Sequence, residues 1–368
     1  MNSTGQRMRG ALIGYGFIGA KGHVPAYLKR RDVEIVAVAD ICAARRGLVP
    51  EQLPRAAVHR SAAELFAAER DRLDFIDIAT PPCDHAAIAS QALDLGMHVL
   101  CEKPLATRFD DGAALLERAL SAKRVLFPCH NYKHAPVVAA IREVISSGQL
   151  GRIRSATLAT FRNTHAKGVT EWNTHWRRQV CHSGGGIAMD HGSHTFYLTF
   201  EWLNGWPTAV TAKMTNQEPE KWDTEDNFSA VLTFPTGFAQ VHLTWTAGVR
   251  KVIYTVQGER GAITVDDDEL QLAIMRRTSG ADVAQGAVTW EVERRMIQSD
   301  WMDASHTRWF NAMFDEFLTA IAGGDYAGKE AQDALRCLEI IATAYRSAAD
   351  GCRELSLGIP RLARRVER

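Results

Sequence analysis

The chain has 368 residues, more than one typical core needs, so two domains are expected. Lysine plus arginine and aspartate plus glutamate both total 43, and this balance argues against nucleic acid or an anionic membrane surface as a partner. Seven scattered cysteines without a CxxC pair, and the lack of an apolar stretch suited to a signal peptide or a membrane span, favour a cytoplasmic protein with reduced thiols.

Short apolar runs alternate with helical patterns over residues 1–128. Five runs are predicted as parallel strands, most of them rich in β-branched residues: 11–14, 34–40, 75–80, 97–103 and 125–132. Amphipathic helices are predicted between them, at 61–71, 84–96 and 109–123. This alternation predicts an α/β fold with a doubly wound parallel sheet.

Residues 129–368 follow a different pattern, so the domain boundary is placed at Cys129. After a helix at 135–151, long runs alternate apolar and polar residues, which predicts an antiparallel sheet with one covered face. These runs are 152–162, 208–216, 228–235, 238–246, 251–258 and 261–267. Helices predicted at 184–203, 307–324 and 330–351 complete an α+β domain.

A glycine-rich turn follows the first predicted strand. Gly14, Gly16 and Gly19 form a G-x-G-x-x-G pattern that encloses Phe17 and Ile18. The first glycine permits a tight turn, the second lets a pyrophosphate approach the backbone, and the third lets the next helix pack closely. The N-terminus of that helix also attracts phosphate. The pattern predicts a dinucleotide-binding site.

An acidic residue ends the second predicted strand. Asp40 lies 21 residues after Gly19, where a carboxylate binds the ribose hydroxyls and repels a 2′-phosphate. NAD is therefore expected as the cofactor in preference to NADP. Arg45 and Arg46 follow and are predicted as surface residues of the next helix.

Two later strand ends are expected at the same edge of the sheet, where ligands bind. Thr80 and Pro81 end one strand beside the expected cofactor. His85 begins the next helix, either as a cofactor contact or as a helix residue without chemistry. Glu102 and Lys103 end the following strand, and a lysine at this position can donate to a substrate oxygen.

The segment GGGIAMDHGSH places Asp190 and His194 four residues apart, on one face of a predicted helix. This spacing suits a catalytic pair, although it also suits an ordinary helix pair. A zinc site is a further alternative, with ligands from Cys181, His182, His191 and His194. The angle between the last two histidines on a helical wheel argues against zinc, so no metal is expected.

In order and spacing, these motifs resemble the Gfo/Idh/MocA oxidoreductase family, and the resemblance covers nearly the whole chain. It implies an N-terminal Rossmann domain followed by an α+β domain with a large, open, mostly antiparallel sheet. It also implies that Lys103, Asp190 and His194 gather around the nicotinamide. His194 is expected as the general base and Lys103 as the donor that stabilises charge on oxygen. Asp190 would bind a neighbouring hydroxyl or orient the other two groups, and Gly192 would leave room for a ligand.

The resemblance, or the local composition, indicates further candidates for binding the cofactor or the substrate. Asn131 is expected near the nicotinamide, whereas Tyr132 points elsewhere if this segment is a strand. The resemblance also places Trp176 and Arg177 against cofactor or substrate. A polar and aromatic stretch suits a polyhydroxylated ligand, with Arg162, Asn163, Trp172 and His175 as candidates. Glu225 and Asp226 are a second candidate wall, or simply a solvated turn.

The expected activity is an NAD-dependent hydride transfer between nicotinamide and a secondary alcohol or ketone of a sugar, cyclitol or related polyol. One alternative is a redox-neutral reaction on a glycoside, by oxidation, elimination and re-reduction. Another is a non-catalytic regulator that senses NAD or sugar, which the presence of Lys103, Asp190 and His194 argues against. The resemblance also implies a homodimer or homotetramer that associates through the open sheet.

Overall fold

The computed structural model describes residues 7–277, 288–298 and 306–358, and these contain two sheets. The first sheet has the strand order β3-β2-β1-β4-β5-β6, and every neighbouring pair is parallel. Its strands are β1 (Met8–Ile13), β2 (Val33–Ala39), β3 (Ala57–His59), β4 (Phe75–Ile78), β5 (His98–Cys101) and β6 (Leu126–Pro128). The predicted doubly wound sheet is confirmed, and the short β3 is an addition to it.

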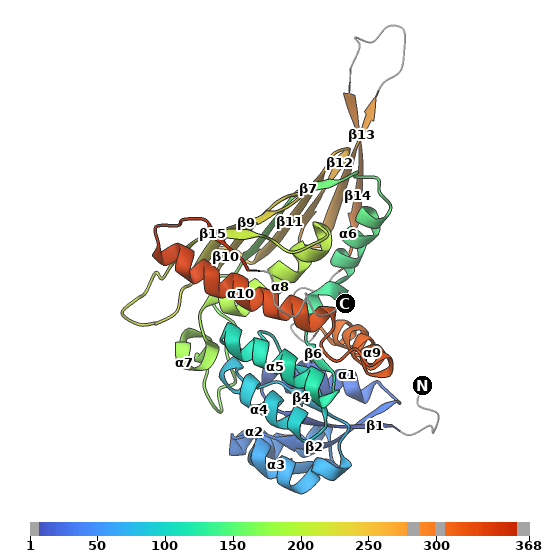
Figure 1. The fold of residues 1–368 in the computed structure, drawn as a ribbon, viewed down its shortest axis with the longest axis vertical. Helices are drawn as coiled ribbons and strands as arrows, with labels where there is room; N and C mark the ends of the chain where they lie inside the picture. Colours follow the sequence, from blue (N-terminus) through green and yellow to red (C-terminus); the bar gives the residue numbers. More distant parts are fainter. Residues whose placement is uncertain (1–6, 278–287, 299–305, 359–368) are drawn as a thin grey trace.

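Helices connect these strands on both faces of the sheet (Figure 1). They are η1 (Gly19–His23), α1 (Val24–Leu28), α2 (Ala43–Gln52), α3 (Ala62–Glu69), η2 (Arg70–Arg72), α4 (Pro82–Asp94) and α5 (Phe109–Ala122). Local chemistry sets their ends. The Ser61 hydroxyl accepts the Glu64 N–H at the start of α3, and a proline occupies the first position of α4.

The second sheet has nine strands in the order β14-β13-β12-β11-β7-β10-β9-β8-β15. They are β7 (Ile153–Phe161), β8 (Ala209–Thr215), β9 (Asn227–Phe234), β10 (Gly237–Thr244), β11 (Lys251–Gly258), β12 (Gly261–Asp266), β13 (Glu269–Arg277), β14 (Val288–Met296) and β15 (Leu355–Ser356). The pairing of β7 with β10 is parallel and the other pairs are antiparallel. The prediction of a mostly antiparallel sheet is confirmed, and β13, β14 and β15 extend it.

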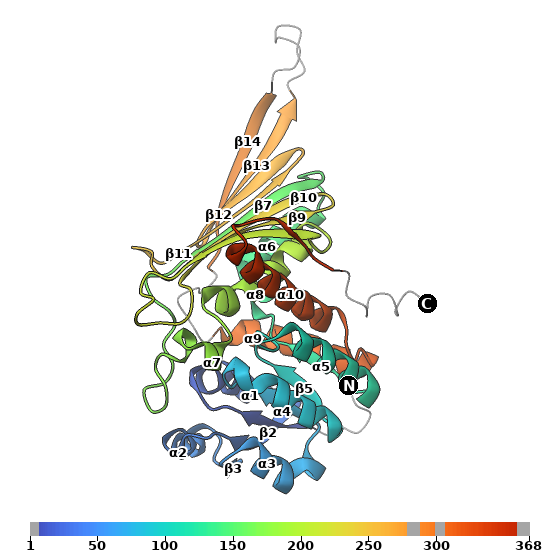
Figure 2. The ribbon, with the colours of Figure 1, turned by 60° about the vertical axis from the view of Figure 1, so that its left-hand side comes forward.

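Helices α6 (Pro136–Ser146), α8 (Ile187–Trp202) and α10 (Lys329–Ala349) share a core with one face of this sheet. Helix α9 (Thr307–Gly323) instead packs Phe310, Phe314 and Phe317 into a core of the first sheet. The shorter elements of this part of the chain are η3 (Asn131–His134), η4 (Trp176–Arg178) and α7 (Val180–Ser183). Figures 1 and 2 show α10 between the two sheets. Ile340 and Ile341 of α10 join the core under the second sheet, whereas Leu335 and Leu338 join a core of the first. The late helices therefore bind the two sheets together across the predicted boundary at residue 129.

The other face of the second sheet is more open. Phe238 on β10 is 43% exposed, and Trp290 on β14 is 61% exposed. Apolar surface of this kind is compatible with a partner, and the homodimer or homotetramer stays a prediction. Among the described residues, no helix is both long enough and apolar enough to cross a membrane.

Candidate active site

A cavity of about 790 Å³ lies between the carboxyl ends of the parallel strands and helix α8. It is lined by most of the residues that the sequence singles out: Gly14, Gly16, Phe17, Ile18, Asp40, Thr80, Pro81, Glu102, Lys103, Asn131, Trp172, Trp176, Arg177, Asp190 and His194. Six binding candidates do not line it, namely Gly19, His85, Asn163, His175, Glu225 and Asp226. The cavity thus joins the predicted nucleotide turn to the predicted catalytic groups.

The three glycines of the turn differ in what surrounds them. Gly14 has a φ of +98°, and a Cβ there would lie 2.6 Å from the carbonyl group of Ala79. Gly16 has no atom within 4 Å of a Cβ position, so its backbone is open to the cavity. At Gly19 a Cβ would lie 2.4 Å from the Gly14 carbonyl oxygen. Gly16 therefore suits close approach of a ligand, and the other two glycines serve the turn and its packing.

Asp40 is held at the opposite end of the cavity from α8 by two backbone N–H groups. Its carboxylate accepts hydrogen bonds of 2.7 Å from the N–H of Tyr15 and of 2.7 Å from the N–H of Cys42. These bonds fix the carboxylate where the ribose hydroxyls are expected.

Arg45 is not the surface residue that the sequence predicts. Its Nε donates to the Tyr15 carbonyl at 2.8 Å, and its Nη1 lies 3.1 Å from Glu171 Oε1. The side chain is buried and lines the cavity. Glu171 belongs to the segment that follows β7, so this ion pair joins the two halves of the molecule beside Asp40.

His85 does not reach the cavity. Its Nδ1 lies 2.8 Å from the Pro104 carbonyl oxygen and its Nε2 lies 2.9 Å from that of Thr80. The ring is completely buried, and burial lowers its pKa. Of the two roles predicted for His85, the geometry favours a helix residue that connects the loops after β4 and β5 over a direct contact with the cofactor.

A compact charge cluster forms where β5 meets α8. Lys103 Nζ donates to the Asp190 carbonyl at 2.7 Å and to Asp190 Oδ1 at 3.2 Å. Arg177 Nε donates to the same Oδ1 at 3.2 Å. Burial raises the pKa of Asp190, but Lys103 and Arg177 outweigh it and hold this pKa well below its ordinary value. Asp190 is therefore a carboxylate at neutral pH. The peptide bond between Lys103 and Pro104 is cis.

His194 lies one turn further along α8 and is held on two sides. Its Nδ1 is 2.8 Å from the Tyr197 hydroxyl, and its ring stacks on that of Tyr132 with centroids 3.9 Å apart. Within residues 7–277, 288–298 and 306–358, no hydrogen-bond partner holds Nε2. Burial lowers the pKa of His194 well below its ordinary value, and the charge of Lys103 lowers it further. The neutral imidazole is left with Nε2 available to a ligand.

Tyr132 is a site residue that the sequence analysis missed. Residues 131–134 form the 3-10 helix η3 rather than the end of a strand. Successive side chains on a strand alternate between faces, but in this helix Asn131 and Tyr132 both line the cavity. Nothing in the sequence of residues 125–132 indicated that the strand gives way to a 3-10 helix at residue 131.

Gly192 also differs from its expected role. A Cβ there would meet the Phe196 ring at 3.0 Å and Ile341 of α10 at 3.8 Å. Gly192 thus lies on the packed face of α8, against α10. Its small size serves helix packing and not the approach of a ligand.

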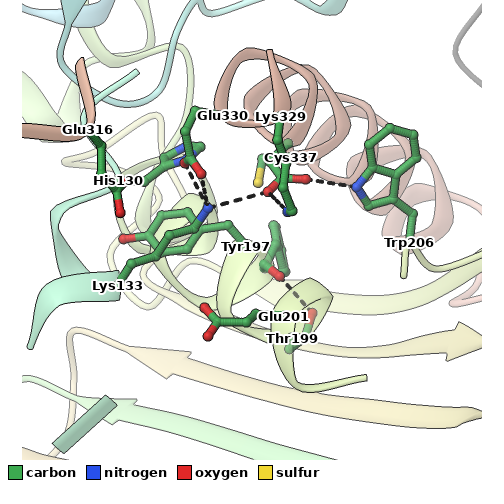
Figure 3. A network of polar contacts seen from close by, with 12 residues as sticks. His130, Lys133, Tyr197, Thr199, Glu201, Trp206, Glu316, Lys329, Glu330 and Cys337 are labelled. Atoms are coloured by element: carbon green, nitrogen blue, oxygen red, sulfur yellow. Dashed lines mark hydrogen bonds and ion pairs between the residues drawn. The ribbon is translucent and has the colours of Figure 1, made fainter. Parts of the chain in front are cut away.

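A buried polar network lies between η3, α10 and Tyr197 of α8 (Figure 3). Lys133 Nζ lies 2.6 and 2.7 Å from the two carboxylate oxygens of Glu330, and His130 Nδ1 lies 2.7 Å from Oε2. The His130 ring packs against the Tyr197 ring, with centroids 4.3 Å apart. The network ties η3 to α10 and helps to hold the tyrosine that contacts His194.

The polar segment after β7 is only partly at the cavity. Asn163 is exposed, and His175 Nδ1 bonds His165 Nε2 at 2.9 Å. Glu225 does not form a ligand wall either. Its carboxylate accepts the N–H groups of Gly186 and Ala188, both at 2.9 Å, and so caps the start of α8.

The four residues of the zinc alternative are not brought within ligand distance of one another. In the described part of the chain, the one group with that spacing is His23, Glu102 and Cys129. His23 Nδ1 lies 2.6 Å from Asp77, and Nε2 lies 3.1 Å from Glu102. Burial lowers the pKa of His23, but the two carboxylates outweigh it and raise it to about 10. An imidazolium therefore links two acids there.

Comparison with known proteins agrees with this architecture. Residues 8–130 match the family model for an oxidoreductase family with an NAD-binding Rossmann fold. Residues 138–264 match the model for the GFO/IDH/MocA C-terminal domain.

Two relatives and one solved structure illustrate the likeness. Levoglucosan dehydrogenase of Pseudarthrobacter phenanthrenivorans is 28% identical over 313 residues, which are 73% of this chain and 76% of the relative. The uncharacterized oxidoreductase YdgJ of Escherichia coli is 24% identical over 348 residues, which are 93% and 96% of the two chains. A structure of levoglucosan dehydrogenase with NADH and levoglucosan has a TM-score of 0.79 at 23% identity, covering 96% of this chain and 100% of that one.

Proposed function

The chain belongs to the Gfo/Idh/MocA family of NAD-dependent oxidoreductases, and we propose that it transfers a hydride between nicotinamide and a secondary alcohol carbon of a sugar, cyclitol or related polyol. One observation carries the proposal. Lys103, Asp190 and His194 line the same cavity as the open backbone of Gly16. Membership of this family makes the protein an enzyme, so the non-catalytic regulator is set aside.

The residues present fit NAD. Gly16 leaves space for a pyrophosphate at the backbone, and the Asp40 carboxylate is oriented by two N–H groups for the ribose hydroxyls. When bound, the nicotinamide ring supplies the acceptor or donor of the hydride. Asn131 is buried and lines the same cavity, and it would hold the nicotinamide end of the cofactor.

His194 is suited to move the proton of the substrate hydroxyl. Its low pKa keeps the ring neutral at physiological pH, so Nε2 can accept a proton when it carries none. Tyr197 and Tyr132 fix the position and the plane of the ring. Because the ring is already oriented, less entropy is lost when the transition state for proton transfer forms.

Lys103 is suited to stabilise negative charge on the same oxygen. Lys103 lines the cavity, and its ammonium group is held by the Asp190 carboxylate and carbonyl. A fixed cation needs no reorganisation as charge develops on oxygen. The Asp190 carboxylate, shared with Arg177, also offers an acceptor for a neighbouring substrate hydroxyl.

Absorbance of reduced nicotinamide tests the proposal. The purified protein is mixed with NAD and, in turn, with inositols, free sugars, sugar acids and glycosides. Steady formation of NADH with one class is the expected result. Tight binding of NAD without reduction across the whole panel would contradict it, and analysis of glycoside products would then test the redox-neutral reaction.

A further inference from the structure

A buried histidine follows the glycine-rich turn and takes no part in the mechanism described above. His23 of η1 is 1% exposed, and its two ring nitrogens contact two different carboxylates. Nδ1 lies 2.6 Å from Asp77 of β4, and Nε2 lies 3.1 Å from Glu102, the residue after β5. His23 thus connects η1 to two neighbouring strands of the parallel sheet.

The imidazole of His23 is held in place by the residues around it. Asp77 is completely buried and accepts the Tyr27 hydroxyl at 2.6 Å, on the same Oδ2 that contacts His23. The Phe310 ring of α9 packs on the imidazole, with centroids 4.3 Å apart. Burial lowers the pKa of His23, but Asp77 and Glu102 outweigh it and raise it to about 10. At neutral pH the ring is therefore an imidazolium that donates to both acids.

Glu102 is the member of this group that reaches the cavity. It lines the cavity, whereas His23 and Asp77 do not. Its Oε1 faces His23, and its Oε2 accepts the Lys103 N–H at 3.1 Å. Burial raises the pKa of Glu102, but His23 and Lys103 outweigh it and hold this pKa below its ordinary value. Glu102 is therefore a fixed carboxylate at the cavity wall.

The order of the parallel strands assigns Glu102 to the nicotinamide half of the cofactor site. Asp40, which is expected to bind the adenosine ribose, follows β2, and the turn that contains Gly16 follows β1. Strands β2, β1, β4 and β5 are successive neighbours in the sheet, so Glu102 lies on the other side of Gly16 from Asp40. An extended dinucleotide that crosses the turn from Asp40 would then end near Glu102.

We propose that His23 is a positioning residue that holds the Glu102 carboxylate at the nicotinamide end of the cavity, where this carboxylate favours the positively charged ring of NAD over the neutral ring of NADH. The inference rests on the NAD cofactor and does not require the proposed substrate. A carboxylate attracts a nearby cation more strongly in a buried site than in water. Hydride transfer to the ring removes its charge, so the bound cofactor is biased toward its oxidised form.

The other groups that act on Glu102 do not supply this negative charge. The Lys103 ammonium is a cation and is shared with the Asp190 carboxylate. Burial lowers the pKa of His85 on α4, so this ring is neutral. Burial also raises the pKa values of two neighbouring thiols, which stay protonated: Cys101 and Cys129.

Binding of NAD and NADH to the purified protein tests the inference without a substrate. NADH binding is followed by its fluorescence, and NAD binding by displacement of NADH. Glu102→Gln removes the charge and keeps the shape of the side chain. It should weaken NAD binding by about tenfold and NADH binding by less than about threefold. Equal losses for the two cofactors would show that Glu102 contacts a part they share, such as a ribose, and would overturn the inference.

Glu69→Gln is the matched control. Glu69 is a buried carboxylate that contacts a histidine, His59, at 3.4 Å, but it does not line the cavity. The affinities of this variant for NAD and NADH should equal those of the wild type.

A double variant tests the part played by His23. His23→Gln with Asp77→Asn removes the imidazolium and one of its two acids, so the net charge is kept and Glu102 loses its cationic partner. Burial should then raise the pKa of Glu102 toward neutrality. The ratio of the NADH to the NAD dissociation constant should be low at pH 6.5 and should approach the wild-type ratio at pH 8.5, as Glu102 loses its proton.

The wild-type ratio should be the same at both pH values. The pKa of His23 is about 10, and burial holds the pKa values of His191 and His194 far below this range, so none of these rings titrates in it. A double variant with the wild-type ratio at both pH values would show that Glu102 is held without His23. Equal loss of both affinities at both pH values would show a purely structural role. Either result would overturn the positioning role.

Glu102→Asp serves as a second test if the double variant does not fold. It keeps the charge but withdraws the carboxylate from His23 by one methylene group. The same decline of the ratio at pH 6.5 is expected, and a ratio equal to that of the wild type would contradict the proposal.

These binding results are separable from the proposed reaction. A loss confined to NAD in Glu102→Gln, without NADH formation across the substrate panel, would support this inference and contradict the reaction. NADH formation from a polyol, with equal losses of NAD and NADH binding in Glu102→Gln, would support the reaction and overturn this inference.

Discussion

The Nδ1 atom of His194 and the hydroxyl oxygen of Tyr197 lie 2.8 Å apart, on the same helix and less than one turn from each other. The hydroxyl also accepts the N–H of Tyr132 at 3.2 Å. This bond occupies one ring nitrogen of His194 and directs the other to the cavity. Tyr197 is therefore a positioning residue in the proposed mechanism, acting on the substrate only through His194.

Tyr197→Phe should lower kcat by about tenfold to a hundredfold, because the imidazole loses the partner that fixes its orientation. NAD affinity should stay within about twofold, since Tyr197 does not line the cavity. Steady-state kinetics over a range of pH would reveal a displaced acid limb, which a purely structural loss would not produce. Tyr326→Phe, remote from the cavity, is the control. An unchanged kcat and pH profile in Tyr197→Phe would remove this role.

The pH dependence of alcohol oxidation follows from the pKa of His194. Burial and the charge of Lys103 lower this pKa, so the proton-accepting form persists below the ordinary value of about 6.5. The kcat/KM for oxidation should thus show no acid limb at about pH 6.5 and should fall only at lower pH. A limb at about 6.5 that is absent from His194→Gln would show that the imidazole is not shielded in this way.

Two glycine substitutions in one turn should have opposite signatures. Gly14→Ala places a Cβ 2.6 Å from the Ala79 carbonyl group at a residue with a positive φ. The free energy of unfolding should therefore fall by about 1–3 kcal/mol. Gly16→Ala meets no atom within 4 Å and should leave the melting temperature nearly unchanged. It should instead weaken NAD binding by about tenfold or more, because the methyl group enters the space for the pyrophosphate. Thermal denaturation and NAD titration of both variants compare the two effects.

If Gly16→Ala binds NAD as tightly as the wild type, the pyrophosphate does not pass over this turn. If Gly14→Ala is as stable as the wild type, the close approach to Ala79 has relaxed.

The ion pair between Arg45 and Glu171 should slow release of the cofactor. Its Nη1–Oε1 distance is 3.1 Å, and it connects α2 to the segment after β7 beside Asp40. An ion pair at an exposed carboxylate contributes little to binding, so Glu171→Gln should speed NADH dissociation by no more than about fivefold. Stopped-flow displacement of NADH measures this rate, with Glu220→Gln, at an exposed position, as the control. An unchanged rate in Glu171→Gln would show that the contact does not restrain the cofactor.

Local patterns in the sequence were sufficient for the parallel sheet and for much of the site. The glycine turn, Asp40, Lys103 and the four-residue spacing of Asp190 and His194 each depend on residues close together in the chain. Their convergence on one cavity follows from the rule that ligands bind at the carboxyl ends of parallel strands.

Other features depend on contacts between distant segments. Arg250 lines the cavity beside Arg162 only because β11 pairs with β7, and no local pattern predicts that pairing. The sequence analysis predicted that the Tyr132 side chain points away from the site, because it predicted a strand where a 3-10 helix forms. Arg45 was predicted as a surface residue because Glu171, which pairs with it, comes from the other half of the molecule.

Transfer of deuterium is the most direct test of the proposed reaction. The polyol identified from the substrate panel is prepared with deuterium on its carbinol carbon and incubated with the protein and NAD. Mass spectrometry and proton NMR of the recovered cofactor then locate the label. Direct hydride transfer predicts one deuterium at C4 of the nicotinamide in each NADH formed. NADH without the label, or label exchanged into water, would contradict the account.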